Sequence, residues 1–360
     1  MLDNVLIFSL EDVHMSYSLA ELAEKIEGTV HGDGTVQINS LSTLNNAGDG
    51  QIAFLSNSKY RQQLADTKAS AVIINEDCLN ECKTNAIVMR NPYLGYALVA
   101  QLLDTTPFPA KNIHPSAVIA DSATIGENVT IGANTVIEER ASIADGASIG
   151  AGCFIGRNTQ IGAYTKIWAN VTIYHEVELG EYCLVQANTV IGSDGFGYAN
   201  HQGHWHKIPQ LGSVIIGNRV EIGASTTIDR GALGNTEIHD GVILDNQIQI
   251  AHNVIVGENT AIAGCSVVAG STEIGKNCTI AGMVAINGHM KISDGSVFTG
   301  MSMVTKPTKE PGVYSSGIPA QPNRDWHKMN AHIRKLPSVN AKIKQLEQEI
   351  AQLKSGATKD

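Results

Sequence analysis

Apolar residues recur at every sixth position over more than half of the chain. A first run extends from Ile113 to Ile191, and a second extends from Ile216 to Val304. One inward aliphatic residue in every six predicts a hexapeptide parallel β-helix, in which three short strands close a coil of about 18 residues. The pattern predicts roughly ten stacked coils, each burying its apolar row against the next. The repeating positions are Ile113, Ile119, Ile125, Ile131, Ile137, Ile143, Ile149, Ile155, Ile161, Ile167, Ile173, Leu179, Val185, Ile191, Ile216, Ile222, Ile228, Ile238, Leu244, Ile250, Val256, Ile262, Val268, Ile274, Ile280, Ile286, Ile292, Phe298 and Val304.

Two insertions interrupt the repeat. The longer one separates Ile191 from Ile216 and contains SDGFGYANHQGHWHKIPQ, and the shorter one lies around residues 231–235. Loops that leave a rigid solenoid are common sites of function. We therefore expect both insertions to border a functional site.

The repeat divides the chain into three parts. Residues 1–106 predict a small α/β domain, with a helix in SLAELAEKIEG that ends at Gly28 and a helix in PYLGYALVAQLLD that begins at Pro92. ASAVIIN and AIVMR predict strands of this domain. Residues 107–319 form the predicted β-helix domain, which follows the linker PFPAKNIHP, and residues 320–360 form a helical extension.

The C-terminal extension carries its own apolar pattern. Pro337 is expected to end one helix and Ser338 to cap the next. An apolar seam with 4-3-4-3 spacing follows, which favours three-fold self-association; a helix folded back on its own coil is the alternative. The seam consists of Val339, Ile343, Leu346, Ile350 and Leu353.

Composition narrows the class of protein. Aromatic residues make up only 5%, which suits a core of stacked aliphatic side chains, and the net charge of −10 argues against binding to nucleic acid or anionic lipid. The six cysteines show no metal-binding spacing, which indicates free thiols in a reducing cytoplasm. VLIFSL lacks a basic flank, so neither a signal peptide nor a membrane span is expected, and Met15 is an alternative start.

Two histidines lie next to the inward row. His252 is two residues past an inward position and His289 is three residues past another, so both are expected near corners of the coil. Gly270 and Gly288 follow His252 at intervals of 18 residues, which predicts a bare groove that exposes backbone N–H groups above the imidazole. His289 lies two coils away, roughly 10 Å along the axis. That separation is too long for a nucleophile–base pair and suits a contact with a more distant part of a ligand.

This arrangement indicates acyl transfer without a covalent enzyme intermediate. His252 would act as general base for a substrate nucleophile, and a backbone N–H would stabilise the oxyanion at a thioester carbonyl. Asp245 is a candidate to fix the imidazole tautomer. A nucleophilic Cys265 and inert, solvated corner histidines are the alternatives.

Eight stretches spread over nearly the whole chain carry a specific pattern: FLSNSKY, NPYLGYA, IWANVTIYHE, GSDGFGYAN, TTIDRGAL, ILDNQIQIAHN, INGHM and YSSGIPAQPN. Together they resemble the family of UDP-3-O-(3-hydroxyacyl)glucosamine N-acyltransferases of lipid A biosynthesis. The resemblance implies a left-handed β-helix. It also implies transfer of a 3-hydroxyacyl chain from acyl carrier protein to the 2-amino group of UDP-3-O-(3-hydroxyacyl)-glucosamine in a cytoplasmic homotrimer. No cofactor or metal is implied beyond the phosphopantetheine arm of the donor.

The resemblance also implies residue roles. In the β-helix it makes His252 the base, Asp245 its partner and Gly270 the oxyanion-binding amide. It makes His289 a substrate contact and Met303 the residue that limits acyl length. It also implies a uridine pocket in the N-terminal domain, formed by Phe54, Asn57 and Tyr60.

Docking of an acidic carrier protein requires a basic patch on this acidic chain. Between residues 305 and 345 eight lysines and arginines stand against two acidic residues, and the first four are Lys306, Lys309, Arg324 and Lys328. A solvated helix face is the alternative explanation. His201, His204 and His206 have a metal-like spacing, but the inferred chemistry requires no metal.

Three other functions share parts of this pattern. A UDP-sugar O-acyltransferase would have the same fold, a zinc hydratase would need three converging histidines, and a non-catalytic binding solenoid would tolerate loss of His252. The N-terminal domain and the NGH motif favour the N-acyltransferase.

Overall fold

The computed structural model describes residues 16–356, which divide into two compact units with a boundary between Phe108 and Pro109. The stretch VLIFSL and the alternative start at Met15 lie outside the described residues.

The first unit is a small α/β domain. Alternate residues of its central strand β6 face opposite clusters: Ile73 packs with the helix residues Leu22 and Val99, and Val72 packs with Leu64. The five-stranded sheet has the order β2-β7-β6-β5-β4. The elements are β1 (Tyr17–Ser18), α1 (Leu19–Lys25), β2 (Thr29–His31), β3 (Gln37–Ile38), β4 (Ser40–Leu41), β5 (Gln51–Phe54), η1 (Ser58–Ala65), β6 (Ala71–Ile74), η2 (Glu76–Glu81), β7 (Asn85–Val88) and α2 (Pro92–Leu102).

The predicted helices and strands of this domain are confirmed, with one correction. A capping box of Ser18 and Glu21 begins α1, and Asn91 caps α2 directly before Pro92. Gly28 does not supply the left-handed residue that follows α1, because Glu27 adopts it at φ 58°. A methyl group at Gly28 would lie 2.3 Å from the Ile87 side chain, so close packing explains this glycine instead.

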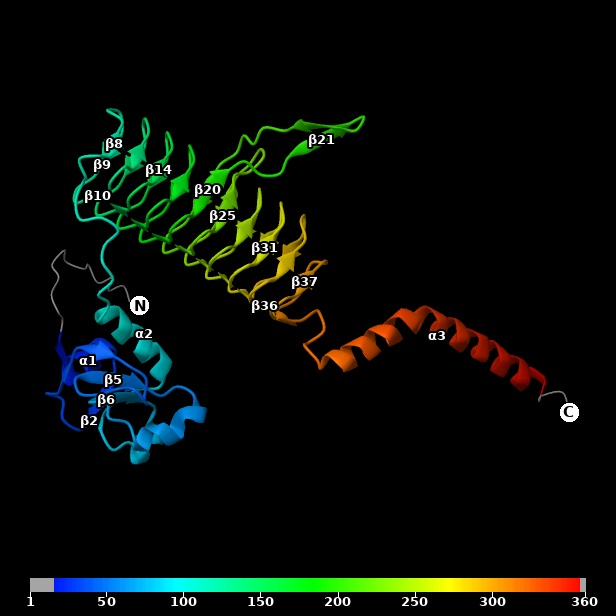
Figure 1. Ribbon diagram of the computed structural model, residues 1–360, viewed down its shortest axis with the longest axis horizontal. Helices are drawn as coiled ribbons and strands as arrows, with labels where there is room; N and C mark the ends of the chain where they lie inside the picture. Colours follow the sequence, from blue (N-terminus) through cyan, green and yellow to red (C-terminus); the bar gives the residue numbers. More distant parts are fainter. Residues whose placement is uncertain (1–15, 357–360) are drawn as a thin grey trace. The chain divides into compact units, whose positions relative to one another are not determined.

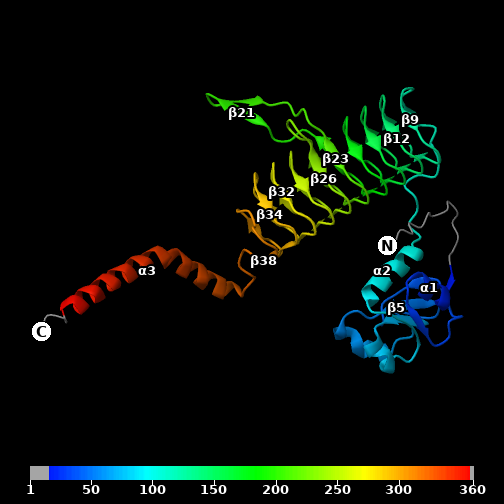
Figure 2. The same cartoon turned by 180° about the vertical axis from the view of Figure 1, so that it is seen from behind.

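The second unit is a parallel β-helix with three flat faces (Figures 1 and 2). Each strand pairs in parallel with the strand one coil away, and the pairing of Ile137 with Ile155 shows the 18-residue repeat. The first face contains β10 (Thr130–Ile131), β13 (Ser148–Ile149), β16 (Lys166–Ile167), β19 (Leu184–Val185), β24 (Glu221–Ile222), β27 (Ile243–Leu244), β30 (Ala261–Ile262), β33 (Thr279–Ile280), β36 (Ser296–Phe298) and β38 (Gly312–Tyr314). The second contains β8 (Val118–Ile119), β11 (Val136–Ile137), β14 (Phe154–Ile155), β17 (Thr172–Ile173), β20 (Val190–Ser193), β25 (Thr227–Asp229), β28 (Gln249–Ile250), β31 (Val267–Val268), β34 (Ala285–Ile286) and β37 (Met303–Val304). The third contains β9 (Thr124–Ile125), β12 (Ser142–Ile143), β15 (Gln160–Ile161), β18 (Glu178–Leu179), β23 (Val214–Ile216), β26 (Thr236–Ile238), β29 (Ile255–Val256), β32 (Glu273–Ile274) and β35 (Lys291–Ile292).

The predicted inward row forms the core of this unit. From Ile131 to Val304 every predicted inward residue is at most 7% exposed. The third residue after an inward position turns the corner in a left-handed conformation, and asparagine often fills it, as at Asn134 (φ 59°) and Asn253 (φ 59°). Corner side chains therefore lie outside the core, where they are free to serve a site.

Both predicted insertions leave the coils on one side of the β-helix. The longer one forms a hairpin of β21 (Tyr198–His201) and β22 (His204–Lys207), which projects away from the coils (Figure 1). The shorter one separates β25 from β26. The hairpin is exposed on both strands, so its base and not its tip is the part that packs on the coils.

The C-terminal segment forms one helix, α3 (Asn323–Gly356), and not two. The prediction that Pro337 ends a helix is wrong, because this proline lies inside α3. Loss of one backbone hydrogen bond bends a long helix without breaking it, and α3 is visibly bent (Figure 1). The seam residues from Val339 to Leu353 are exposed in the single chain. No helix in the described part of the chain is both long enough and apolar enough to cross a bilayer.

Candidate active site

His252 lies in a column along one corner of the β-helix. Strand β28 pairs with β31, β31 with β34, and β34 with β37. The second residue after each inward position is therefore, coil by coil, His252, Gly270, Gly288 and Lys306. This register confirms the predicted column and extends it by one coil to a lysine.

The imidazole of His252 covers the backbone of Gly270. A methyl group at Gly270 would lie 2.7 Å from His252 Nε2 and 2.8 Å from Cε1, well inside normal contact distance. The ring therefore fills the space left by the missing side chain, so the bare groove expected above His252 begins one coil further on. Because Gly270 has no Cβ, His252 Nε2 can lie close to the Gly270 peptide.

Gly270 offers a free amide at this point. Its carbonyl accepts a hydrogen bond from the His289 N–H at 3.0 Å, whereas its own N–H has no partner among the described residues. A methyl group at Gly288 would lie 2.7 Å from the Gly270 oxygen and 3.7 Å from its nitrogen. We call Gly270 and Gly288 the glycine strip; its Gly270 N–H lies next to the imidazole without a hydrogen-bond partner among the described residues.

A hydrogen-bond chain fixes the tautomer of His252. The Ala232 N–H donates to Asn253 Oδ1 at 2.9 Å, which identifies this amide atom as the oxygen. The same oxygen lies 3.1 Å from His252 Nδ1, so Nδ1 must carry the proton and donate. Nε2 is then left with a lone pair in the plane of the ring, while the face of the ring lies over Gly270. The chain starts in the shorter insertion, because Ala232 belongs to it.

The longer insertion also contacts His252. Gly195 is buried, and a methyl group there would lie 2.7 Å from His252 Cβ and 3.1 Å from Cδ2. The side chain of His252 thus packs closely against both Gly195 and Gly270. These two contacts leave the ring little freedom to change its position.

A buried arginine anchors the base of this loop. Arg230 is 2% exposed, its Nε donates to the Gly212 carbonyl at 2.7 Å, and its Nη1 lies 2.6 Å from His175 Nε2. The Arg230 N–H also donates to the Ser193 carbonyl at 2.9 Å. These contacts tie both ends of the longer insertion to one residue, Arg230, in the coil before His252.

Asp229 ends β25, the strand that pairs with β28 before His252. Its carboxylate was not among the residues predicted for the site. Gln249 Nε2 and Ser193 Oγ donate to it at 2.9 Å and 3.2 Å. Burial raises the pKa of the Asp229 carboxyl, while these hydrogen bonds and the nearby His252 oppose the rise. TTIDRGAL contains Asp229, but the shorter insertion breaks the 18-residue arithmetic that would have placed it next to the histidine.

Asp245 and His252 are not brought together within one chain. Asp245 follows β27 of the first face, and its carboxylate accepts from the N–H groups of Asn246 at 2.7 Å and Gly264 at 2.9 Å. His252 follows β28 of the second face. The predicted partnership would therefore require Asp245 to meet a histidine from a different chain.

The other predicted residues of the β-helix lie further along the column. His289 is exposed and occupies a left-handed corner position at φ 55°, where asparagine stands in other coils. Met303 and Lys306 line the same cavity of about 260 Å³, which also includes Phe298 and Tyr314. Met303 is 65% exposed and is therefore free to contact a ligand.

In the first unit, the three predicted uridine contacts lie at the end of β5 and the start of η1. Asn57 caps η1 by accepting from the Lys59 N–H at 3.0 Å, and Tyr60 is 53% exposed. The ring of Phe54 stacks on that of Tyr96 with centroids 4.1 Å apart. Phe54 thus belongs to an aromatic group with α2, which only the fold assembles.

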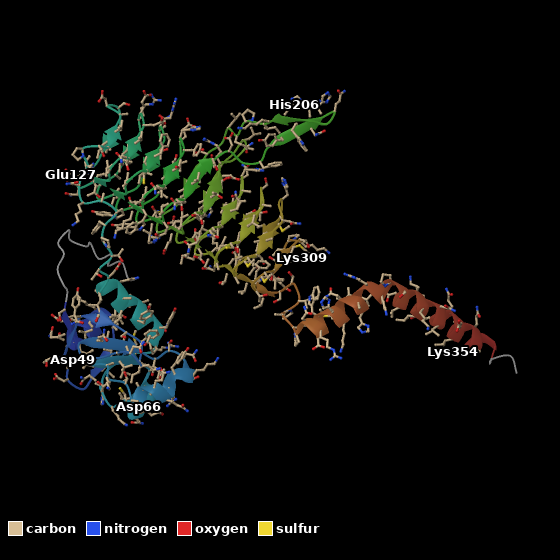
Figure 3. The ribbon with its side chains drawn as sticks, in the orientation of Figure 1. Asp49, Asp66, Glu127, His206, Lys309 and Lys354 are labelled. Atoms are coloured by element: carbon tan, nitrogen blue, oxygen red, sulfur yellow. The ribbon has the colours of Figure 1, made fainter. Side chains whose placement is uncertain are left out.

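The basic residues and the histidine hairpin are exposed. Lys306, Lys309, Arg324 and Lys328 are all exposed, and Lys328 has a weak ion pair with Asp325 at 3.9 Å. His206 lies on the projecting hairpin (Figure 3). In the described part of the chain no group of three or more histidine, cysteine or acidic residues is arranged to hold a metal ion.

Comparisons with known proteins identify the family of this chain. A family model described as UDP-3-O-(3-hydroxymyristoyl) glucosamine N-acyltransferase matches residues 35–102, and one for bacterial transferase hexapeptide repeats matches residues 112–139 and 158–193. The chain is 62% identical to a UDP-3-O-acylglucosamine N-acyltransferase of Colwellia psychrerythraea, over 94% of this chain and 99% of the relative. A protein of the same name from Pseudoalteromonas translucida is 63% identical, over 92% of this chain and 98% of the relative.

Among solved structures, the Arabidopsis UDP-N-acetylglucosamine acyltransferase superposes with a TM-score of 0.51 at 20% identity. The match covers 57% of this chain and 71% of that protein. It supports the left-handed β-helix fold.

Proposed function

The chain belongs to the UDP-3-O-acylglucosamine N-acyltransferase family, and from this premise we propose how it carries out the reaction. A 3-hydroxyacyl chain moves from acyl carrier protein to the 2-amino group of UDP-3-O-(3-hydroxyacyl)-glucosamine, with His252 as general base. The observation that carries the proposal is the lone pair of His252 Nε2 beside the free Gly270 amide.

His252 accepts the proton of the attacking amine. The amine nitrogen forms a bond to the thioester carbon, and Nε2 takes the proton that the nitrogen loses. The fixed Nδ1–H tautomer supports this role, because its other nitrogen is already an acceptor. Asn253 holds the ring in that state throughout.

Gly270 stabilises the charge that develops on the thioester oxygen. Its N–H has no competing partner among residues 16–356 and lies in a corner of the coil, so little reorganisation is needed when the oxyanion forms. When the tetrahedral intermediate collapses, the carbon–sulfur bond breaks and the His252 imidazolium returns a proton to the thiolate. The products are the amide and the free thiol of the carrier.

The glycine strip is the path that we assign to the phosphopantetheine arm. It leads from His252 past Gly288 to Lys306, over about three coil spacings, or roughly 14 Å. His289 stands beside the strip and is placed to bind the arm. Lys306, Lys309, Arg324 and Lys328 are the proposed contacts for the acidic carrier protein.

The remaining assignments follow the same premise. We propose that Phe54, Asn57 and Tyr60 bind the uridine, that Met303 limits acyl length, and that the reaction needs no cofactor besides the donor's arm. Six free thiols and an acyl carrier protein donor favour the cytoplasm.

We further propose a homotrimer. The apolar seam of α3 is exposed in the single chain, and Asp245 can reach an imidazole only if another subunit supplies it. Light scattering should give three times the chain mass. A monomer with full activity would refute both the trimer and the role of Asp245.

The direct test is acyl transfer to UDP-3-O-acyl-glucosamine by wild type and His252→Ala. Loss of a general base is expected to lower kcat by about 10²–10⁴-fold, with an unchanged melting temperature because His252 lies outside the core. Transfer from acyl carrier protein and from the corresponding acyl-coenzyme A is compared to identify the donor. An unchanged rate for His252→Ala would exclude this histidine as the base.

A further inference from the structure

Gln210 carries a buried oxygen with no partner. It closes the longer insertion just before β23 and is 7% exposed, whereas the nine residues before it are all exposed. Its Oε1 is fully buried and accepts no hydrogen bond from the described residues. Buried polar side-chain atoms are nearly always satisfied, so an orphaned acceptor indicates that a donor arrives from elsewhere.

The orientation of the amide is determined by its other end. Gln210 Nε2 donates to the Ile208 carbonyl at 3.0 Å. Exchanging the two amide atoms would place two oxygens against each other, so the oxygen must be the free atom. A methyl group at Gly197 would lie 2.5 Å from Nε2, which shows how closely the loop encloses this end of the side chain.

The free oxygen lies on the same side of His252 as the loop. A single point, the position of a methyl group on Gly195, is 3.1 Å from His252 Cδ2 and 3.2 Å from Gln210 Oε1. Cδ2 is bonded to Nε2 in the imidazole ring. Gln210 Oε1 and the Cβ–Cδ2 side of His252 therefore both lie next to Gly195.

We propose that Gln210 Oε1 accepts a hydrogen bond from the 2-amino group of the sugar acceptor and so selects an amine over a hydroxyl. This inference rests on the proposed function. A neutral amine has two N–H bonds and one lone pair. One N–H donates to His252 Nε2 and the other to Gln210 Oε1, which directs the lone pair at the thioester carbon.

A hydroxyl nucleophile cannot satisfy both acceptors. It has a single hydrogen, and if that hydrogen goes to His252 the Gln210 oxygen stays buried and unpaired. Sites built to bind an N–H discriminate strongly against ligands that lack it, because their own polar groups are left unsatisfied. Gln210 is thus a substrate-positioning residue that favours N-acyl transfer over O-acyl transfer.

The experiment compares two acceptors with the full-length protein and 3-hydroxyacyl carrier protein. One is UDP-3-O-acyl-glucosamine, and the other is UDP-3-O-acyl-glucose, which has a hydroxyl in place of the 2-amino group. Gln210→Met keeps the length of the side chain and removes the acceptor. Gln160→Met, on the exposed side of β15, is the matched control.

Gln210→Met is expected to lower kcat/KM for the amine by about 10–100-fold, to leave the slow hydroxyl reaction unchanged, and to keep the melting temperature of wild type. The ratio of amine to hydroxyl transfer then falls by the same factor, which a merely structural role would not produce. Gln210→Asn, which withdraws the oxygen by one methylene, should lower the ratio in the same direction and serves if the Met variant does not fold.

Two results would overturn the inference differently. Equal losses for both acceptors, or no loss, would reject the role of Gln210 while leaving the acyltransferase intact. Wild-type protein that transfers nothing to the amine would reject the proposed function and the inference together.

Discussion

Alanine at position 270 would place a methyl group against the imidazole of His252. The added carbon would lie 2.7 Å from Nε2 and 2.8 Å from Cε1. Normal contact begins near 3.4 Å, so the ring must move by about 0.7 Å, although its side chain already packs closely against Gly195. Displacement of a reacting group on this scale costs about 10²-fold in rate, or about 2.7 kcal/mol of activation free energy.

The effect should be kinetic and local. Gly270 does not adopt a positive φ, so alanine meets no backbone strain, and overpacking at a half-buried site should cost about 1 kcal/mol of stability. Gly300→Ala is the matched control, because it occupies the same position of its hexad and its methyl group would meet only the Gly282 oxygen, at 3.6 Å.

Steady-state kinetics of acyl transfer and thermal melting are measured for wild type, Gly270→Ala, Gly300→Ala and His252→Ala. Combining Gly270→Ala with His252→Ala should add little to the loss from His252→Ala alone, since both changes act through one ring. Wild-type kcat for Gly270→Ala would refute the reasoning, because the imidazole would then be either uninvolved or free to move.

Two further outcomes follow from the same structure. Asn253→Asp keeps both accepted hydrogen bonds and adds a negative charge beside the imidazole. Because this charge stabilises the imidazolium, the acidic limb of the pH–rate profile should move to higher pH. Asn259→Asp at an equivalent exposed corner is the control, and equal profiles for both variants would contradict the contact with Asn253. Burial raises the pKa of the Cys183 thiol to about 11, so at pH 8 only about 10⁻³ of this thiol is thiolate. Iodoacetamide should therefore label the exposed Cys265 first in the folded protein, as followed by mass spectrometry with Cys265→Ser as the control. Rapid labelling of Cys183 would show that the coil opens.

The six-residue period by itself determined the parallel β-helix of the second unit, whereas its left-handedness came from the family resemblance. One buried aliphatic residue per hexad admits only one stacking register, because a shift of a single residue would turn the row from Ile131 to Val304 outward. The same arithmetic located the column of His252, Gly270 and Gly288, since residues 18 apart must stack. The offset of His289 from the inward row likewise placed it at a left-handed corner.

Signals from single residues were less reliable than the six-residue period. Pro337 predicted a helix end, but one lost hydrogen bond was not enough to break α3. Gly28 was taken as a helix stop, whereas its packing against Ile87 explains it.

Only the tertiary structure decided what surrounds the imidazole. Insertions have no period, so the sequence could not show that Gly195 packs against His252, that Ala232 and Asn253 fix its tautomer, or that Gln210 carries an unpaired oxygen beside it. Likewise Asp245 is nearer to His252 along the chain than Asp229 is, but Asp245 follows a strand of another face, whereas Asp229 ends the strand that pairs with β28. Repetition makes the coils predictable because each repeats the contacts of the last, whereas the site is built from the segments that leave the repeat.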